Sequence, residues 1–213
     1  MTPRILFYVQ HLLGIGHLAR ASRICAALAE TGAEVTMVTG GLPVAGFPGP
    51  EARHIALPPV QTAGEGFAGL ADGRGRPVDA AFLSARRDRL LAAFHDLRPD
   101  AVVTEAFPFG RRQMRFELLP LIEAAAAARP RPLLFCSLRD ILQEKAKPGR
   151  DEETVATVRA HYDRVLVHGD PAFARLEDSF PLAPLIADKV VHTGLVAPPP
   201  PVPATDPAPP APP

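Results

Sequence analysis

The sequence predicts an α/β protein with a doubly wound, Rossmann-like parallel sheet and a proline-rich tail. Apolar, β-favouring runs alternate with helix-like segments almost to the end of the chain, which is typical of a parallel sheet with helices on both faces. From residue 197 onward proline and alanine predominate, and such a segment cannot bury a core. We therefore expect one Rossmann-like domain over residues 1–196 and a disordered tail over residues 197–213.

The first strand and helix have the clearest pattern. The run at 5–9 is continuously apolar, as expected of a strand that is buried on both faces of a sheet. In the segment that follows, apolar residues recur at helical spacing from Leu18 to Leu28, and Gly32 provides a stop signal. These features predict a strand, a glycine-containing loop and a helix, in that order.

The later elements continue the alternation. Pro120 falls inside one helical stretch, where we expect it to kink the helix or to begin a second piece. The segment 58–77 is rich in glycine and proline and has no periodicity, so we expect a long loop there. Further strands are expected at 35–39, 54–57, 101–104, 133–136, 164–168 and 189–192, and helices at 78–97, 111–128, 152–161 and 171–178.

Composition argues against several classes of protein. The 23 basic residues balance the 23 acidic ones, so no long-range field attracts nucleic acid, and nothing indicates association with a membrane surface. We find no apolar segment that resembles a signal peptide or a membrane span, and we expect a cytoplasmic protein. Cys25 and Cys136 lie in apolar segments and are expected to be buried free thiols rather than a disulfide or a metal pair.

Two glycines and a histidine lie between the first strand and the first helix. At Gly14 and Gly16 the backbone can approach a ligand closely, and the N-terminus of a helix favours negative charge. The sequence therefore predicts a site for a phosphate-bearing or otherwise anionic ligand, with the imidazole of His17 beside it.

A dinucleotide cofactor fits this loop poorly. Gly14, Gly16 and Ala19 satisfy the loose fingerprint, but residues 10–13 separate the first glycine from the strand. The second strand also ends in glycine, where the fingerprint requires an acidic residue for the ribose. We therefore expect no nicotinamide or flavin cofactor.

Polar residues follow several of the predicted strands. In an open parallel sheet, ligands bind outside the carboxyl ends of the strands, and these ends lie at one edge. The polar groups expected at that edge are Gln10, His11 and His17 after the first strand, Glu105 to Arg112 after the fourth, Ser137 to Asp140 after the fifth, and His168 to Asp170 after the sixth.

His17 and Glu105 are the candidate catalytic residues. An imidazole can take a proton from a hydroxyl group near neutral pH, and the positive end of the helix dipole favours its neutral form. In the alternative interpretation, His17 only hydrogen-bonds to the glycine loop. Glu105 is expected to orient His17 or to act as the base itself, unless it pairs with Arg111 or Arg112.

Three arginines are candidates for substrate binding, together with Gly14 and Gly16. Arg111 and Arg112 can hold a phosphate or carboxylate in a bidentate manner, although exposed, solvated side chains are an equal alternative. Arg139 is a further candidate, unless it pairs with Asp140. The charged group at 86–89 is expected to be a solvated helix face, and no histidine or cysteine cluster has metal-ligand spacing.

The chain resembles the N-terminal half of a two-domain GT-B glycosyltransferase of the family 28 type, which includes the enzyme that adds N-acetylglucosamine to lipid-linked muramyl peptide. Two further segments resemble a bacterial group of predicted glycosyltransferases, and the likeness runs from about Arg4 to Gly194. The residues that carry it are the strand at 4–9, the loop at 14–17, the segments 26–29 and 32–35 for family 28, and 103–112 and 167–171 for the bacterial group.

This resemblance implies an inverting hexosyl transfer from a nucleotide sugar to an acceptor hydroxyl, without a metal or another cofactor. His17 would be the base, Glu105 would assist it, and the first loop would lie near the acceptor and the donor diphosphate. Family members continue into a donor-binding domain at a position like 194–196, where this chain becomes proline-rich. We therefore expect an acceptor-binding half that lacks the donor domain and is inactive alone.

Two other functions fit the same features. The chain is alternatively a non-catalytic, Rossmann-like binding module or remnant for an anionic metabolite. A third interpretation is a sugar-nucleotide epimerase with the GT-B fold, which would also need a second domain.

Overall fold

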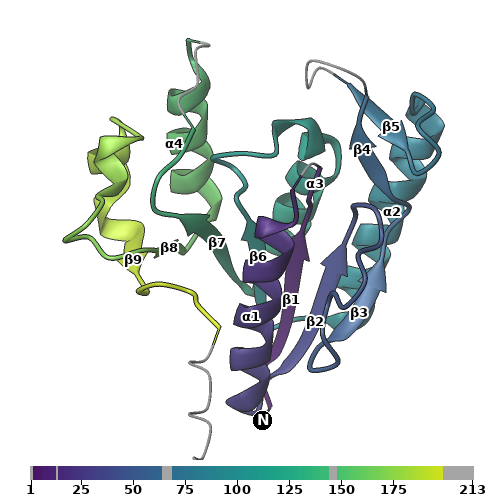
Figure 1. Ribbon diagram of the computed structural model, residues 1–213, viewed down its shortest axis with the longest axis horizontal. Coiled ribbons are helices and arrows are strands. Elements are labelled where there is room, and N and C mark those ends of the chain that lie inside the picture. Colours follow the sequence, from purple (N-terminus) through teal and green to yellow (C-terminus); the bar gives the residue numbers. More distant parts are fainter. Residues whose placement is uncertain (1, 13, 64–68, 144–147, 199–213) are drawn as a thin grey trace, which may run out of the picture.

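The computed structural model describes residues 2–12, 14–63, 69–143 and 148–198, and its centre is a parallel sheet of seven strands (Figure 1). The order across the sheet is β3-β2-β1-β6-β7-β8-β9, and every neighbouring pair is parallel. This arrangement confirms the predicted α/β, Rossmann-like fold. The strands are β1 (Arg4–Val9), β2 (Glu34–Thr39), β3 (Arg53–Ala56), β6 (Ala101–Glu105), β7 (Leu133–Arg139), β8 (Arg164–His168) and β9 (Val190–His192).

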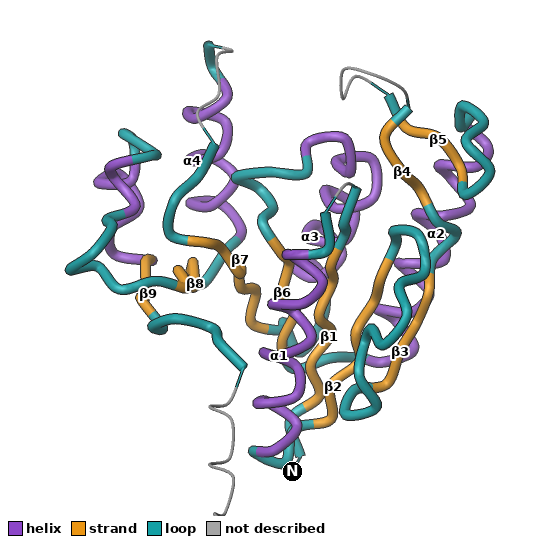
Figure 2. The backbone as a smooth tube through the Cα atoms, viewed as in Figure 1, coloured by secondary structure: helices purple, strands orange, loops and turns teal. Residues whose placement is uncertain are grey.

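Helices cover both faces of the sheet (Figures 1 and 2). In β1, Phe7 packs with α1 (Gly16–Glu30) on one face, whereas Leu6 and Tyr8 belong to the core of the other face. Because side chains alternate along a strand, a strand that packs on both faces is apolar at every position, as 5–9 is. The core that contains Leu6 and Tyr8 also includes residues of α2 (Ala80–Leu97), α3 (Arg115–Ala127) and α4 (Arg150–His161).

The predicted helix boundaries have identifiable local causes. After α1, Gly32 adopts a left-handed conformation with φ of 89°, which confirms the predicted stop signal. The carboxylate of Asp79 accepts a hydrogen bond of 2.8 Å from the amide of Phe82 and so caps α2. Among the described residues, no helix is both long and apolar enough to cross a membrane.

Two local predictions were wrong, and one of two alternatives at Pro120 was not realised. Segment 58–77, expected to be a loop, contains an antiparallel pair of strands, β4 (Val60–Thr62) and β5 (Leu70–Asp72). The pair was not predicted because strands of three residues are too short to show a periodicity in the sequence. The helix expected at 171–178 is reduced to a 3₁₀ turn at Leu176–Asp178. Pro120 does not begin a second helical piece: a 3₁₀ turn at Arg112–Met114 precedes α3, and α3 continues through the proline.

The expectation that residues 86–89 form a solvated helix face is wrong at Arg86. Its side chain is fully buried, and its Nε donates to Glu117 Oε2 at 2.7 Å. Nη2 donates to Gln10 Oε1 at 2.7 Å, and Nη1 donates to the carbonyl of Gly40 at 3.0 Å. The partner carboxylate comes from α3, so the helical periodicity around Arg86 could not indicate the pair. The pair ties α2 and α3 to the segments that follow β1 and β2.

Residues 199–213 lie outside the described residues, so the predicted tail and the domain boundary at 196 remain predictions. Cys25 and Cys136 are buried and free, as expected. Burial raises the pKa of the Cys25 thiol to about 12, so both packing and protonation make this sulfur unreactive.

Candidate functional site

His17 and Glu105 meet at the carboxyl edge of the sheet. Glu105 is the last residue of β6, and His17 lies in the first turn of α1. Their contact joins His17 Nδ1 to Glu105 Oε1 at 2.9 Å. The carboxylate is fully buried, whereas 27% of the histidine side chain is exposed. The pair therefore combines an accessible imidazole with a carboxylate that solvent does not reach.

Arg20 is the second residue of α1 that contacts Glu105. Its Nη2 donates to the same Oε1 atom that contacts His17. Arg20 was not among the site residues predicted from the sequence, although its spacing of three residues from His17 places both on one helix face. That spacing was the signal available in the sequence.

Glu105 is held as a carboxylate in spite of its burial. Burial raises its pKa, but the hydrogen bond from His17, the charge of Arg20 and the hydrogen bond from Ser137 outweigh that effect and hold the pKa below its usual range. An ionised carboxylate only accepts hydrogen bonds, so His17 Nδ1 carries the proton in its contact of 2.9 Å with Glu105 and does not accept from Arg20 Nη2, which lies 3.3 Å away. In the Nδ1–H tautomer Nε2 is an acceptor, and no described residue hydrogen-bonds to it.

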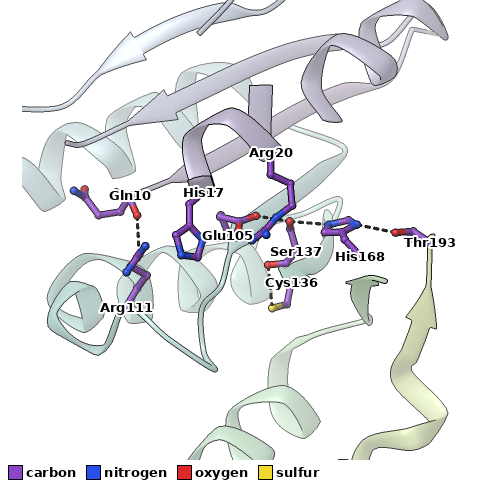
Figure 3. A network of polar contacts seen from close by, with 9 residues as sticks. All are labelled: Gln10, His17, Arg20, Glu105, Arg111, Cys136, Ser137, His168 and Thr193. Atoms are coloured by element: carbon purple, nitrogen blue, oxygen red, sulfur yellow. Dashed lines mark hydrogen bonds and ion pairs between the residues drawn. The ribbon is translucent and has the colours of Figure 1, made fainter. Parts of the chain in front are cut away.

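Glu105 has further polar neighbours on its other side (Figure 3). Ser137, in β7, donates its hydroxyl to Glu105 Oε2. The same oxygen of Ser137 lies 2.9 Å from His168 Nε2, at the end of β8. His168 Nδ1 lies 2.7 Å from the hydroxyl of Thr193, which follows β9. The polar contacts therefore extend from α1 across the ends of β6, β7 and β8.

Comparison with known proteins identifies the fold. No protein-family profile matches the chain. No curated protein matches it either. Solved structures do match: a glycosyltransferase from Rickettsia africae ESF-5 at a TM-score of 0.57 and 11% identity, covering 90% of this chain and 42% of that one. Acinetobacter baumannii MurG matches at 0.50 and 13% identity, covering 92% and 46%.

UGT2 of Phytolacca americana, complexed with UDP-2fluoro-glucose and pterostilbene, matches at a TM-score of 0.51 and 14% identity, covering 93% of this chain and 55% of that chain. The fold is GT-B glycosyltransferase-like. At these identities the likeness concerns the fold alone, and this chain spans about half the length of each of these structures.

Within this GT-B-like fold, Arg111 lies beside the His17–Glu105 pair (Figure 3). Its Nε donates to the carbonyl of Gln10 at 2.7 Å, and its backbone is left-handed with φ of 55°. Burial lowers the pKa of Arg111, and among the described residues no carboxylate lies within ion-pair distance of it. The alternative pairing of Glu105 with Arg111 or Arg112 is not formed.

The remaining predicted substrate-binding residues have different surroundings. Arg112 forms an ion pair with Glu153 of α4 and is thus already neutralised. Arg139 is exposed at the end of β7, and in the described part of the chain it does not pair with Asp140. Gly14 and Gly16 are exposed, and a Cβ atom at either position would meet nothing within 4 Å. Their role as ligand-binding residues remains a prediction.

The described residues contain no cluster of three histidine, cysteine, aspartate or glutamate side chains that could hold a metal ion. The site as a whole therefore consists of one accessible imidazole, one buried carboxylate, nearby guanidinium groups and an open glycine-containing loop. These groups can accept a proton from a neutral ligand and bind an anionic one.

Proposed function

We propose that this chain is the acceptor-binding half of an inverting, nucleotide-sugar-dependent glycosyltransferase. The observation that supports this proposal best is the contact of 2.9 Å between His17 Nδ1 and Glu105 Oε1 at the carboxyl edge of a GT-B-like sheet. A similar structure, UGT2, is complexed with UDP-2fluoro-glucose and pterostilbene. The ligands proposed here are likewise a nucleotide sugar and an acceptor with a hydroxyl group.

In the proposed reaction, Nε2 of His17 takes the proton of the acceptor hydroxyl. The acceptor oxygen forms a bond to the anomeric carbon while the bond from that carbon to the diphosphate oxygen breaks. The bonding electrons leave with the nucleoside diphosphate. The buried Glu105 carboxylate stabilises the imidazolium that forms and holds the ring in the Nδ1–H tautomer.

The N-terminus of α1 is suited to the diphosphate. The first amides of a helix have no acceptor within the helix, and Ile15 at the cap position makes no side-chain hydrogen bond to them. No acidic residue lies in the first turn. Because these amides carry partial positive charge, we propose that they stabilise the leaving group without a metal or another cofactor.

Arg111 favours a second candidate function, a non-catalytic module that binds an anionic metabolite. A partly buried guanidinium without a carboxylate is suited to a phosphate or carboxylate of a ligand. Both candidates require anion binding, but only the transferase requires a base. The two functions therefore differ in the effect of replacing His17.

The test uses the protein encoded by the complete reading frame that contains this chain. Glycine-rich strand–turn–helix segments beyond codon 213 would supply a donor-binding unit, and the protein is then assayed with a panel of nucleotide sugars. We expect His17→Ala to lower kcat by about 10²–10⁴-fold, as is usual when a general base is removed. The control is His95→Ala, at an exposed position of α2.

Unchanged kcat in the His17 variant, with a lower melting temperature, would support a purely structural histidine. A protein that binds phosphate but turns over none of the nucleotide sugars would support the non-catalytic module.

A further inference from the structure

Three polar side chains at the site have no part in the proposed transfer. Ser137 is 1% exposed and His168 is 8% exposed, and Thr193 contacts the far side of the histidine ring. Burial of polar groups destabilises a protein unless they form hydrogen bonds. Here they form one continuous chain of hydrogen bonds that ends on Glu105 (Figure 3).

The donors in this chain follow from counting hydrogen atoms. Ionised Glu105 only accepts, so the single hydrogen of the Ser137 hydroxyl points to Oε2. His168 Nε2 must then carry the hydrogen that is shared with Ser137 Oγ at 2.9 Å. Burial lowers the pKa of His168, so the ring is neutral at neutral pH and its Nδ1 is an acceptor. Thr193 therefore donates to Nδ1 across 2.7 Å rather than to the carbonyls of Val167 and Gly194, which lie 3.4 and 3.5 Å from its hydroxyl oxygen.

The tautomer of His168 determines whether the Ser137 hydroxyl donates its hydrogen to Glu105. If the hydrogen moved to Nδ1, Nε2 would become an acceptor and would compete with Glu105 for the Ser137 hydroxyl. Glu105 would then lose one of the donors that keep it ionised. The hydroxyl of Thr193 opposes this change, because it supplies a hydrogen bond to unprotonated Nδ1.

We propose that Ser137, His168 and Thr193 are positioning residues, which orient Glu105 and thereby keep His17 with its proton on Nδ1. Their effect on catalysis rests on the proposed function, whereas the proton arrangement itself does not. The groups that contact Glu105 are His17 and Arg20 from α1 and Ser137 from β7. Its charge also interacts with the thiols of Cys25 and Cys136, the ring of His168 and the guanidinium of Arg111.

A nucleophilic role for Ser137 conflicts with the same geometry. A serine beside a histidine is a common catalytic pair, but a nucleophile must reach its substrate. Ser137 is buried, and its only hydrogen is donated to a carboxylate. It therefore acts on the substrate only through Glu105 and His17.

The first test determines the histidine tautomers of the chain labelled with ¹⁵N-histidine, since long-range ¹H–¹⁵N spectra separate Nδ1–H from Nε2–H rings. We expect His168 as Nε2–H and His17 as Nδ1–H in the unaltered protein. Thr193→Val should change His168 from one tautomer to a mixture. The matched control is Thr39→Val, which removes the contact of 2.7 Å between Thr39 and His54 and should leave both rings unchanged.

The second test follows the carboxyl ¹³C resonance of Glu105 during an acid titration. Ser137→Ala removes one donor from the carboxylate, so the pKa of Glu105 should rise toward its ordinary value. The control Thr39→Val should leave this titration unchanged.

Two results would overturn the proposal: His168 as Nδ1–H in the unaltered chain, or an unchanged titration of Glu105 in Ser137→Ala. If Ser137→Ala fails to fold, the tautomers of the unaltered chain and of Thr193→Val decide. These spectra need no turnover, so a failure to observe glycosyl transfer would count against the proposed function and leave the proton arrangement standing.

Discussion

Arg86 and Arg87 are adjacent in the sequence but lie in opposite environments. Arg86 is fully buried against Glu117, whereas Arg87 is partly exposed and pairs with Asp88. We expect Arg86→Met to lower the free energy of unfolding by about 3–5 kcal/mol, because Glu117 would remain as an unpaired buried charge. Arg87→Met should change it by less than about 0.5 kcal/mol. Urea denaturation measures both, and equal effects would contradict the buried pair.

A second prediction for single residues concerns pH. Burial lowers the pKa of His168, so between that value and the ordinary one the unfolded chain binds more protons than the folded chain. The free energy of unfolding therefore falls as the pH decreases below about 6.5, by at most about 1.4 kcal/mol per pH unit for each such histidine. The pKa values of His11 and His54 are also lowered by burial, so these residues contribute to the same dependence.

The control is His168→Gln. In this variant we expect the free energy of unfolding to change less steeply with pH, but still to change, when it is measured by urea denaturation between pH 7.5 and about 5.5. An unchanged slope would show that His168 does not contribute. Glu105 affects the free energy of unfolding only at lower pH, because its pKa lies below the usual carboxyl value.

At the scale of single elements, the N-terminus of α1 is the predicted site for an anionic ligand. Its uncapped first turn and the open space at Gly16 predict weak binding of inorganic phosphate, with Kd in the millimolar range, which corresponds to about 4 kcal/mol. Gly16→Val should abolish this binding, because the branched side chain fills the space that the ligand needs. The protein offers no clash at that position, so the sheet should remain intact.

Amide chemical shifts of residues 14–20 during a phosphate titration provide the measurement. Ser22→Val, further along the same helix, is the control and should bind phosphate as the unaltered chain does. If the shifts are absent, or if they persist in Gly16→Val, the loop does not bind phosphate and only connects β1 to α1.

The whole molecule is organised around the centre of its sheet. β1 and β6 have strands on both sides, whereas β3 and β9 are the edges. We expect amides of β1 and β6 to exchange most slowly with deuterium and those of β3 and β9 most rapidly, because an edge strand opens without disrupting the core. Mass spectrometry of peptides after exchange gives the order, and protection of β9 equal to that of β1 would contradict it.

Much of this architecture was predictable because its causes are local. The strand at 5–9 is apolar throughout since it packs on both faces, and Gly32 ends α1 because glycine tolerates a left-handed conformation. The meeting of His17 and Glu105 was also predictable in outline. His17 follows β1 and Glu105 ends β6, and the carboxyl ends of these strands lie at one edge of a parallel sheet, although 88 positions separate the two residues in the chain.

The α/β class and most of the strands and helices can be predicted from the amino-acid sequence, because periodicity, helix stops and apolar runs depend on near neighbours in the chain. The partners of the charged and polar groups become known only from the folded chain: Arg86 pairs with Glu117, Arg112 with Glu153, and Ser137 with Glu105 and His168. A buried charge depends on a partner that comes from another element. No local pattern records that partner, and the packing of the elements brings the two together.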